Sequence, residues 1–213
     1  MALGLGELEA PRGATSRGRI VVLNGFPGTG KLTILKNLEA QLDGQDIRVI
    51  DSHLTMDPMQ SVYPDKDLNH YYLRRQLREV YFGEIRRIAS QGCLVLMTTC
   101  LVGNVADHKV LDEYLNMVRG TGIPMIWVNV HCEQRILEER VTSPGRAGGT
   151  KSKLTDVHVL RQVTEGSRLI TPRSAGHEID GVDLVTARLD VSGRVEEAVD
   201  KVSAVIGRER LRQ

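Results

Sequence analysis

One lysine and a group of glycines near the amino terminus have the residue types and spacing that bind phosphate. In order, these residues are Gly25, Phe26, Pro27, Gly28, Thr29, Gly30 and Lys31. Glycine lacks a Cβ, so the backbone N–H groups of such a turn can converge on phosphate oxygens. The ammonium of Lys31 can reach the terminal phosphates, and the helix expected after it adds the positive end of its dipole. This segment is therefore predicted to bind the polyphosphate of a nucleotide.

The residues match the Walker A pattern G-x-x-x-x-G-K-[ST] except at the last position, which is Leu32. A hydroxyl at that position normally ligates Mg²⁺. Thr33 follows, but a step of one residue turns the side chain by about 100° around a helix, so Thr33 cannot simply replace the missing ligand. Either water and another side chain hold the metal, or metal binding is weakened. A glycine-rich loop without any ligand is the structural alternative, and the strand and helix patterns on either side argue against it.

Apolar runs alternate with helical patterns along the chain, which is typical of a parallel α/β sheet. The predicted strands are Ile20–Leu23, Ile47–Ile50, Cys93–Thr98, Pro124–Val130 and Leu184–Val191. A helix is expected after each of the five strands, although Thr55–Asp67, which precedes the second helix, is predicted to be a loop because of its two prolines. We expect one domain over residues 19–207, with a flexible N-terminal tail at 1–18 and a C-terminal tail at 208–213.

The second and third predicted strands end in residues that could contact a ligand. Asp51 ends the second strand and His53 follows it, while Thr98 and Thr99 end the third strand. Ligand-contacting groups gather beyond the carboxyl ends of the strands in open α/β sheets. Asp51 and His53 are therefore candidates for binding or activating an acceptor, although Asp51 could instead cap a turn and His53 could lie on the surface. The third strand lacks a terminal carboxylate, so one of its threonines could orient a metal-bound water.

A long helix is predicted from about Asp67 to Ser90. Its expected apolar stripe is Leu73, Leu77, Val80, Ile85 and Ile88. Spacings of four residues place His70, Arg74 and Arg78 on another face, with Arg75 beside them. Because this helix follows the Asp51 segment, we expect Arg74, Arg75 or Arg78 to bind a polar or anionic acceptor. A solvated basic face is the alternative.

Residues 140–155 are predicted to form a mobile lid. The part from Ser143 to Lys153 holds three cations and no acid, and its glycines and proline favour a loop. Such a lid would exclude water from phosphate transfer, and Arg140 and Arg146 could neutralise charge on the transferred group. The alternative is a solvated surface loop.

Composition indicates an ordinary soluble protein of one domain. The chain has 213 residues, of which 41% are hydrophobic and 26% charged, with a net charge of +1. This balance, with only 4% aromatic residues, argues against a long nucleic-acid groove. The number of cysteines is odd, and their spacing does not match a metal site, which favours a reduced cytoplasmic setting. No apolar run approaches membrane-spanning length, and residues 1–18 do not resemble a secretory signal.

The chain resembles the small P-loop kinases of the AAA-domain and chloramphenicol-phosphotransferase-like type, which are related in fold to nucleoside monophosphate kinases. The matching segments are Asn24–Thr33, Asp51–Leu54 with Asp57 and Pro58, the Arg74–Arg75 helix, and Arg140–Thr155 around Ser143–Pro144. The resemblance covers most of residues 19–206 and implies a three-layer fold, with a five-stranded parallel sheet in the order 2-3-1-4-5. It also implies that Asp51 acts as a base and that Gly-Lys-Leu-Thr is a usable variant of the loop. The Thr98–Thr99 end departs from the acid that the resemblance leads us to expect.

The leading hypothesis is an ATP-dependent phosphotransferase that acts, with Mg²⁺, on a hydroxyl of a small molecule. ATP is preferred to GTP because no Asn-Lys-x-Asp motif occurs in the chain. A second hypothesis is a nucleotide-binding ATPase or switch module that acts on a protein partner. A third is a kinase for nucleosides, nucleotides or nucleic-acid ends. The sequence does not name the acceptor.

Overall fold

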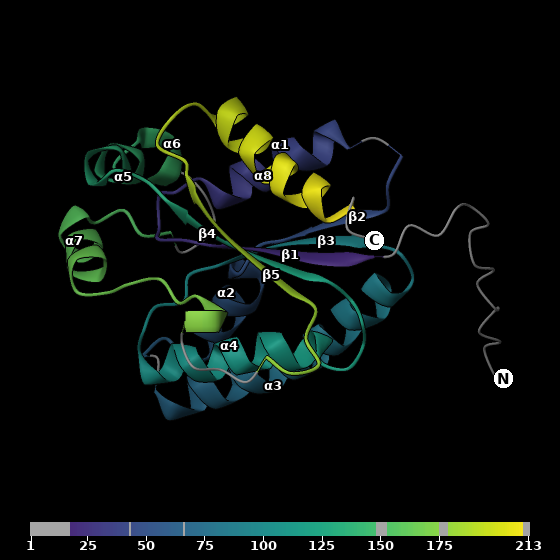
Figure 1. The fold of residues 1–213 in the computed structure, drawn as a ribbon. Coiled ribbons are helices and arrows are strands. Elements are labelled where there is room, and N and C mark those ends of the chain that lie inside the picture. Colours follow the sequence, from purple (N-terminus) through teal and green to yellow (C-terminus); the bar gives the residue numbers. More distant parts are fainter. Residues whose placement is uncertain (1–17, 43, 66, 148–152, 175–178, 211–213) are drawn as a thin grey trace, which may run out of the picture.

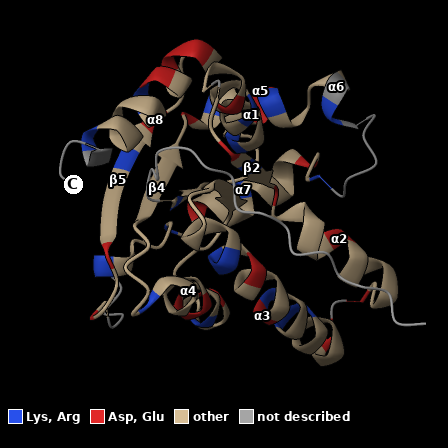
Figure 2. Cartoon of the chain, turned by 90° about the vertical axis from the view of Figure 1, so that its right-hand side faces the viewer, with Lys and Arg blue, Asp and Glu red and all other residues tan. Residues whose placement is uncertain are grey.

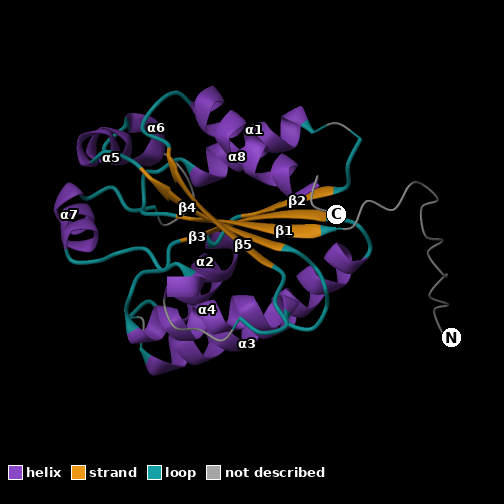
Figure 3. Cartoon of the chain, in the orientation of Figure 1, coloured by secondary structure: helices purple, strands orange, loops and turns teal. Residues whose placement is uncertain are grey.

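The computed structural model describes residues 18–42, 44–65, 67–147, 153–174 and 179–210 and shows a β-sheet between two layers of helices (Figures 1 and 3). The strands are β1 (Arg19–Asn24), β2 (Ile47–Ile50), β3 (Leu94–Thr99), β4 (Met125–His131) and β5 (Leu184–Asp190). Their order in the sheet is β2-β3-β1-β4-β5, and all four neighbouring pairs are parallel. The predicted α/β fold and strand order are confirmed.

Helices cover both faces of the sheet. They are α1 (Lys31–Gln41), α2 (His53–Val62), α3 (Leu68–Ser90), α4 (Val105–Val118), α5 (Gln134–Val141), α6 (Pro144–Ala147), α7 (Val157–Glu165) and α8 (Val195–Arg210). Helices α1 and α8 lie on one face, α3 and α4 lie on the other, and α5, α6 and α7 gather near the carboxyl edge (Figure 1). Within the described residues, no helix combines the length and apolar character needed to cross a bilayer.

The alternation of side chains in β1 explains why this strand lies in the centre. Ile20 and Val22 pack into the core beneath α3 and α4, whereas Val21 and Leu23 pack into the core beneath α1 and α8. All four side chains are fully buried. A strand that is buried on both faces reads as a continuous apolar run, and its carboxyl end is held rigidly. The glycine-rich loop therefore starts from a fixed point.

The prediction of a loop over Thr55–Asp67 is wrong for its first half, where α2 forms despite Pro58. Proline removes one backbone donor inside a helix. The loss is offset because Thr55 and Met59 are buried on one side of α2, and α2 packs against α3. Thr55 also donates its hydroxyl to the carbonyl of Ser52 at 3.1 Å. The packing of one helix face outweighed the local signal from the proline.

The predicted apolar stripe of α3 is also partly wrong. Val80 is 75% exposed, and the buried residues are His70, Arg78, Phe82, Ile85 and Ala89. The buried face thus follows the line that was predicted to carry the basic residues. Arg78 is accommodated because its guanidinium pairs with Glu113 of α4, with Nε 2.6 Å from Oε2. Figure 2 shows charges of both signs along α3.

The two predicted tails lie at the ends of the described part of the chain. The N-terminal tail predicted at 1–18 lies outside the described residues apart from Gly18. At the other end, α8 continues to Arg210, into the segment predicted as a C-terminal tail.

Candidate active site

The glycine-rich loop leaves the carboxyl end of β1 and leads directly into α1. Gly28 and Gly30 have φ values of 91° and 80°, in the left-handed region that disfavours side chains. Gly25 is required for space, because a Cβ there would lie 2.6 Å from Cγ2 of Val130. The N–H of Gly25 donates to the carbonyl of Thr99 at 3.2 Å, which ties the loop to the end of β3. Two glycines thus allow the turn and a third allows its close approach to β4.

Lys31 folds back over the loop. Its Nζ donates to the carbonyl oxygens of Gly25 at 2.5 Å and Phe26 at 3.0 Å, and to Oγ1 of Thr29 at 3.3 Å. Burial lowers the pKa of Lys31 from its ordinary value; the charge of Arg146 also lowers it, while Cys100 and Asp51 act in the opposite direction. An ammonium in this position can exchange carbonyl partners for phosphate oxygens.

Phe26 joins the loop to the helices near the carboxyl edge. It packs against a small apolar cluster of Leu137 and Val141 from α5 and Leu160 from α7. Leu154, which precedes α7, packs against the same cluster. Helices α5 and α7, which flank the loop predicted from Ser143 to Lys153, therefore pack against the phosphate-binding loop through Phe26. Pro27, Leu32 and Thr33 occupy the remaining predicted positions, and Leu32 and Thr33 lie in the first turn of α1.

Asp51 is 7% exposed at the end of β2. Thr98 of the neighbouring strand β3 donates its hydroxyl to Oδ1 of Asp51 at 3.1 Å, and the same hydroxyl accepts from the N–H of Ser52 at 3.0 Å. The N–H of His53 also donates to Oδ1 of Asp51 at 3.3 Å. The Thr98 hydroxyl and the His53 N–H thus orient the carboxylate, and the N–H of Ser52 fixes the Thr98 hydroxyl.

His53 is turned toward its own helix. Its Nδ1 lies 3.1 Å from Oδ1 of Asp57, one turn further along α2. The imidazole of His53 therefore has an acidic partner on the same helix, while the backbone N–H of His53 donates to Asp51.

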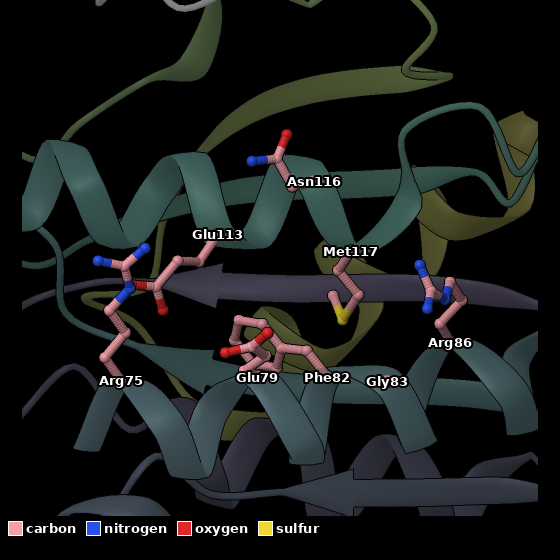
Figure 4. A pocket seen from close by; sticks show the side chains of 8 residues that line it. All are labelled: Arg75, Glu79, Phe82, Gly83, Arg86, Glu113, Asn116 and Met117. Carbon is pink, nitrogen blue, oxygen red and sulfur yellow. The ribbon is translucent and has the colours of Figure 1, made fainter. Parts of the chain in front are cut away.

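The three predicted arginines of α3 lie in different surroundings. Arg74 and Arg78 line a cavity of about 20 Å³ together with Asp51, Thr98 and Tyr114. Arg75 is exposed on the outer side, where it lines a wider groove of about 350 Å³ between α3 and α4. Figure 4 shows Arg75 at one end of this groove and Arg86 at the other. The structure therefore brings Arg74 and Arg78 to Asp51 and places Arg75 elsewhere.

The two arginines of the predicted lid, Arg140 and Arg146, form different hydrogen bonds. The guanidinium of Arg140 donates to the carbonyls of Val191 at 3.2 Å and Gly193 at 3.1 Å, in the turn between β5 and α8. Arg146 donates from Nε to the carbonyl of Leu154 at 2.8 Å. Burial lowers the pKa of Arg146, and its charge acts on Lys31. Residues 148–152, the middle of the predicted lid, lie outside the described residues.

A buried polar network behind the site was missed by sequence reasoning. Asn24 ends β1 and donates from Nδ2 to Oδ1 of Asn129 at 3.0 Å, and Oδ1 of Asn24 accepts from the N–H of Leu101 at 2.7 Å. Trp127 donates from Nε1 to the same Asn129 oxygen at 3.0 Å. The network joins β1 and β4 to the segments that follow β3 and α7. Its signal in the sequence was one asparagine at the end of the first apolar strand and another within the fourth.

The described side chains do not form a resident metal site. They contain no group of three or more His, Cys, Asp or Glu side chains that could hold an ion. Mg²⁺ in phosphate-transfer sites keeps several waters and takes one or two carboxylates together with phosphate oxygens. Because Asp51 and the phosphate-binding loop are both bound to the end of β3, the residues fit a Mg²⁺ ion that arrives with a nucleotide.

The fold and the loop place the chain among proteins with the P-loop kinase architecture. Residues 18–163 match the model of the family described as chloramphenicol phosphotransferase-like protein, and this match spans more than half of the chain. The protein therefore belongs to the chloramphenicol phosphotransferase-like family. No curated protein sequence matches it.

Solved structures share the fold over most of the chain. The tunicamycin resistance protein of Deinococcus radiodurans has a TM-score of 0.55 at 13% identity, covering 90% of this chain and 96% of its own. A sugar kinase from Janibacter sp. HTCC2649 has a TM-score of 0.53 at 15% identity, covering 89% and 95%. A gluconokinase from Sinorhizobium meliloti 1021 has a TM-score of 0.51 at 19% identity, covering 92% and 95%. At such low identity these similarities show a common fold.

Proposed function

We propose that this protein is an ATP-dependent phosphotransferase that moves the γ-phosphate to a hydroxyl of a small molecule. The observation that carries the proposal is that the loop of Lys31 and the carboxylate of Asp51 are both bound to the carboxyl end of β3, the loop through the carbonyl of Thr99 and Asp51 through the hydroxyl of Thr98. A phosphate-binding cation and a buried, oriented carboxylate are the two groups that hydroxyl phosphorylation requires. Membership of the chloramphenicol phosphotransferase-like family supports the same reaction class.

Each residue has a defined task in the proposed reaction. Lys31 and the loop N–H groups hold the β- and γ-phosphates in line with the acceptor. Asp51 accepts the proton of the acceptor hydroxyl through a carboxylate oxygen. The hydroxyl oxygen forms a bond to the γ-phosphorus while the bond from that phosphorus to the β–γ bridging oxygen breaks, which leaves ADP. Bound Mg²⁺ would supply charge neutralisation on the phosphate oxygens.

We assign neutralisation of the transferred group first to Arg146, because its charge already acts on Lys31. Arg140 is bound to the carbonyls of the turn between β5 and α8, and it would have to exchange those partners to take part. Closure of residues 140–155 over the loop would exclude water and favour transfer over hydrolysis.

A screen of hydroxyl compounds with Mg²⁺ and ATP, read as ADP release, tests the proposal. Acceptor-dependent ADP release and a phosphorylated acceptor detected by mass spectrometry are expected. ATP turnover that occurs with water alone and ignores every acceptor would instead favour the ATPase or switch module. That alternative is supported by Leu32 and by the absence of a carboxylate at the end of β3.

A further inference from the structure

Two arginines of helix α3 line the cavity beside Asp51, and of these two only Arg78 forms an ion pair among the described residues. Arg78 forms two bonds to the carboxylate of Glu113, from Nε to Oε2 at 2.6 Å and from Nη2 to Oε1 at 3.1 Å. This bidentate pair joins α3 to α4 and satisfies the charge of Arg78 within the protein. Arg78 is therefore part of the scaffold.

Arg74 lies one turn earlier, and no described carboxylate forms an ion pair with it at the distance of the Arg78–Glu113 pair. Its Nε is fully buried, and within the described residues it has no hydrogen-bond partner. Burial lowers the pKa of Arg74, and the positive charge of Arg78 lowers it further. Asp107 is the acidic residue whose charge opposes this effect, but its Oδ2 already accepts from the N–H of Val102 and from Nδ2 of Asn104, both at 2.9 Å.

A buried N–H donor without an acceptor is costly, and a ligand that supplies the acceptor recovers that cost. Arg74 and Asp51 line the same cavity, along with Ser52, Thr98 and Tyr114. Its volume of about 20 Å³ holds about one atom group of the size of water, such as one oxygen of a ligand. The wall of the cavity thus contains both the carboxylate of Asp51 and the arginine whose Nε has no partner within the described residues.

We infer that the acceptor carries an anionic group close to the hydroxyl that is phosphorylated, and that Arg74 binds this group. The inference rests on the proposed phosphotransferase function and names the substrate class. A guanidinium offers donors in a fork that matches the oxygens of a carboxylate, sulfate or phosphate, whereas a neutral hydroxyl would leave the charge unmatched. Carboxylate, sulfate and phosphate would bind the guanidinium in the same way. Acceptors that carry different anionic groups therefore show which of these groups the site prefers.

Matched pairs of acceptors test the inference. The pairs are D-glycerate with glycerol, gluconate with sorbitol, and glycerol 3-phosphate with glycerol, each assayed for ADP release with Mg²⁺ and ATP. In the wild-type protein, the anionic member of the productive pair should have a kcat/KM at least about 10-fold higher. Arg74→Gln should remove at least about 10-fold of that preference, and Arg74→Lys should restore part of it. Arg75→Gln is the control, because Arg75 faces the outer groove (Figure 4).

A binding measurement decides the case in which no panel member is turned over. In protein labelled with ¹⁵N-arginine, the Nε–Hε resonance that disappears in Arg74→Gln is assigned to Arg74. Glycerate, sulfate or phosphate should shift this resonance in the presence of a nonhydrolysable ATP analogue, while glycerol should not. Failure of every anion to shift it, or equal kcat/KM for neutral and anionic partners, would overturn the inference.

Failure of the proposed function is recognised separately. ATP binding is measured by calorimetry on the same preparations, with Lys31→Ala as the reference for a damaged loop. Intact ATP binding with an indifferent Arg74 rejects only the anionic acceptor. Absent ATP binding rejects the phosphotransferase itself.

Discussion

The hydroxyl of Thr98 lies 3.1 Å from Oδ1 of Asp51, and these two residues end neighbouring strands of the sheet. Strand β3, where the resemblance led us to expect a metal-binding acid, thus supplies a hydroxyl donor. This donor orients Asp51 at the end of the neighbouring strand β2. The N–H of His53 also donates to this oxygen, so the carboxylate is held in one direction. This arrangement favours a single fixed base over a pair of metal-binding acids.

Asp51→Asn should lower kcat for phosphate transfer by about 10²- to 10⁴-fold, because an amide cannot accept the proton of the acceptor. The KM for ATP should change little, since Asp51 is proposed to act on the acceptor. Steady-state kinetics with the acceptor found in the screen provide the measurement. Asp46→Asn is the matched control, since Asp46 is exposed just before the other end of β2. A kcat that is equal in Asp51→Asn and the wild type would contradict the role of base.

Lys31→Ala should reduce transfer at least about 100-fold and weaken ATP binding, because the cation facing the terminal phosphates is lost. Calorimetric titration with ATP and the transfer assay measure the two effects. Lys36→Ala, which removes an exposed lysine from the same helix, should leave both unchanged. Undiminished ATP affinity in Lys31→Ala would remove the basis for placing the nucleotide at this loop.

Gly25→Ala should destabilise the protein more than Gly30→Ala. A Cβ on Gly25 would lie 2.6 Å from the Val130 side chain and 2.8 Å from its carbonyl oxygen, whereas one on Gly30 meets nothing within 4 Å. The cost at Gly30 is therefore limited to its left-handed backbone, about 1–2 kcal/mol. Urea unfolding of the two variants measures the difference. The reverse order of stability would show that the tight approach of the loop to β4 is wrong.

The ion pair between α5 and α7 should make stability depend on pH. Arg161 donates to both oxygens of Glu138 at 2.7 Å, and these bonds lower the pKa of Glu138 to about 2. A carboxyl group whose pKa is lower in the folded than in the unfolded protein stabilises the fold at pH values above its unfolded pKa of about 4.3. That contribution is lost as the pH falls toward 2. Glu138→Gln should therefore lower Tm by at most a few degrees at pH 7.

The difference in Tm between Glu138→Gln and the wild type should shrink progressively between pH 5 and pH 2, for which thermal scans at several pH values provide the data. Glu139→Gln is the control, since Glu139 pairs only with Arg135 within α5 among the contacts of the described residues. A difference that is constant with pH would show that the Glu138 pair does not titrate as described.

Asn129→Ala should destabilise the protein by about 1–3 kcal/mol, because it removes an acceptor from the buried donors of Asn24 and Trp127. Chemical denaturation followed by tryptophan fluorescence reports the loss. Asn37→Ala, which affects an exposed asparagine of α1, should change stability far less. Equal stability of the two variants would mean that the network is dispensable.

The sheet and its phosphate-binding loop could be predicted because their signals are local. Ile20–Leu23 is apolar on both faces, and the glycines before Lys31 have no other common use in that context. The helix over His53–Val62 could not be predicted, since Pro58 dominated the local pattern while the burial of Met59 depends on α3. The inward face of α3 was missed for a similar reason: Glu113, which makes a buried Arg78 possible, lies on another helix.

The placement of two arginines one turn apart on α3 has a consequence for how such enzymes diversify. Arg78 joins α3 to α4 through its ion pair with Glu113, whereas the buried Nε of Arg74 forms no hydrogen bond within the described structure. A substitution at position 74 therefore breaks no hydrogen bond of Nε in the described structure, whereas one at position 78 breaks an ion pair between two helices. A lineage could exchange one class of acceptor for another by substitutions at a single turn, with the nucleotide machinery inherited intact.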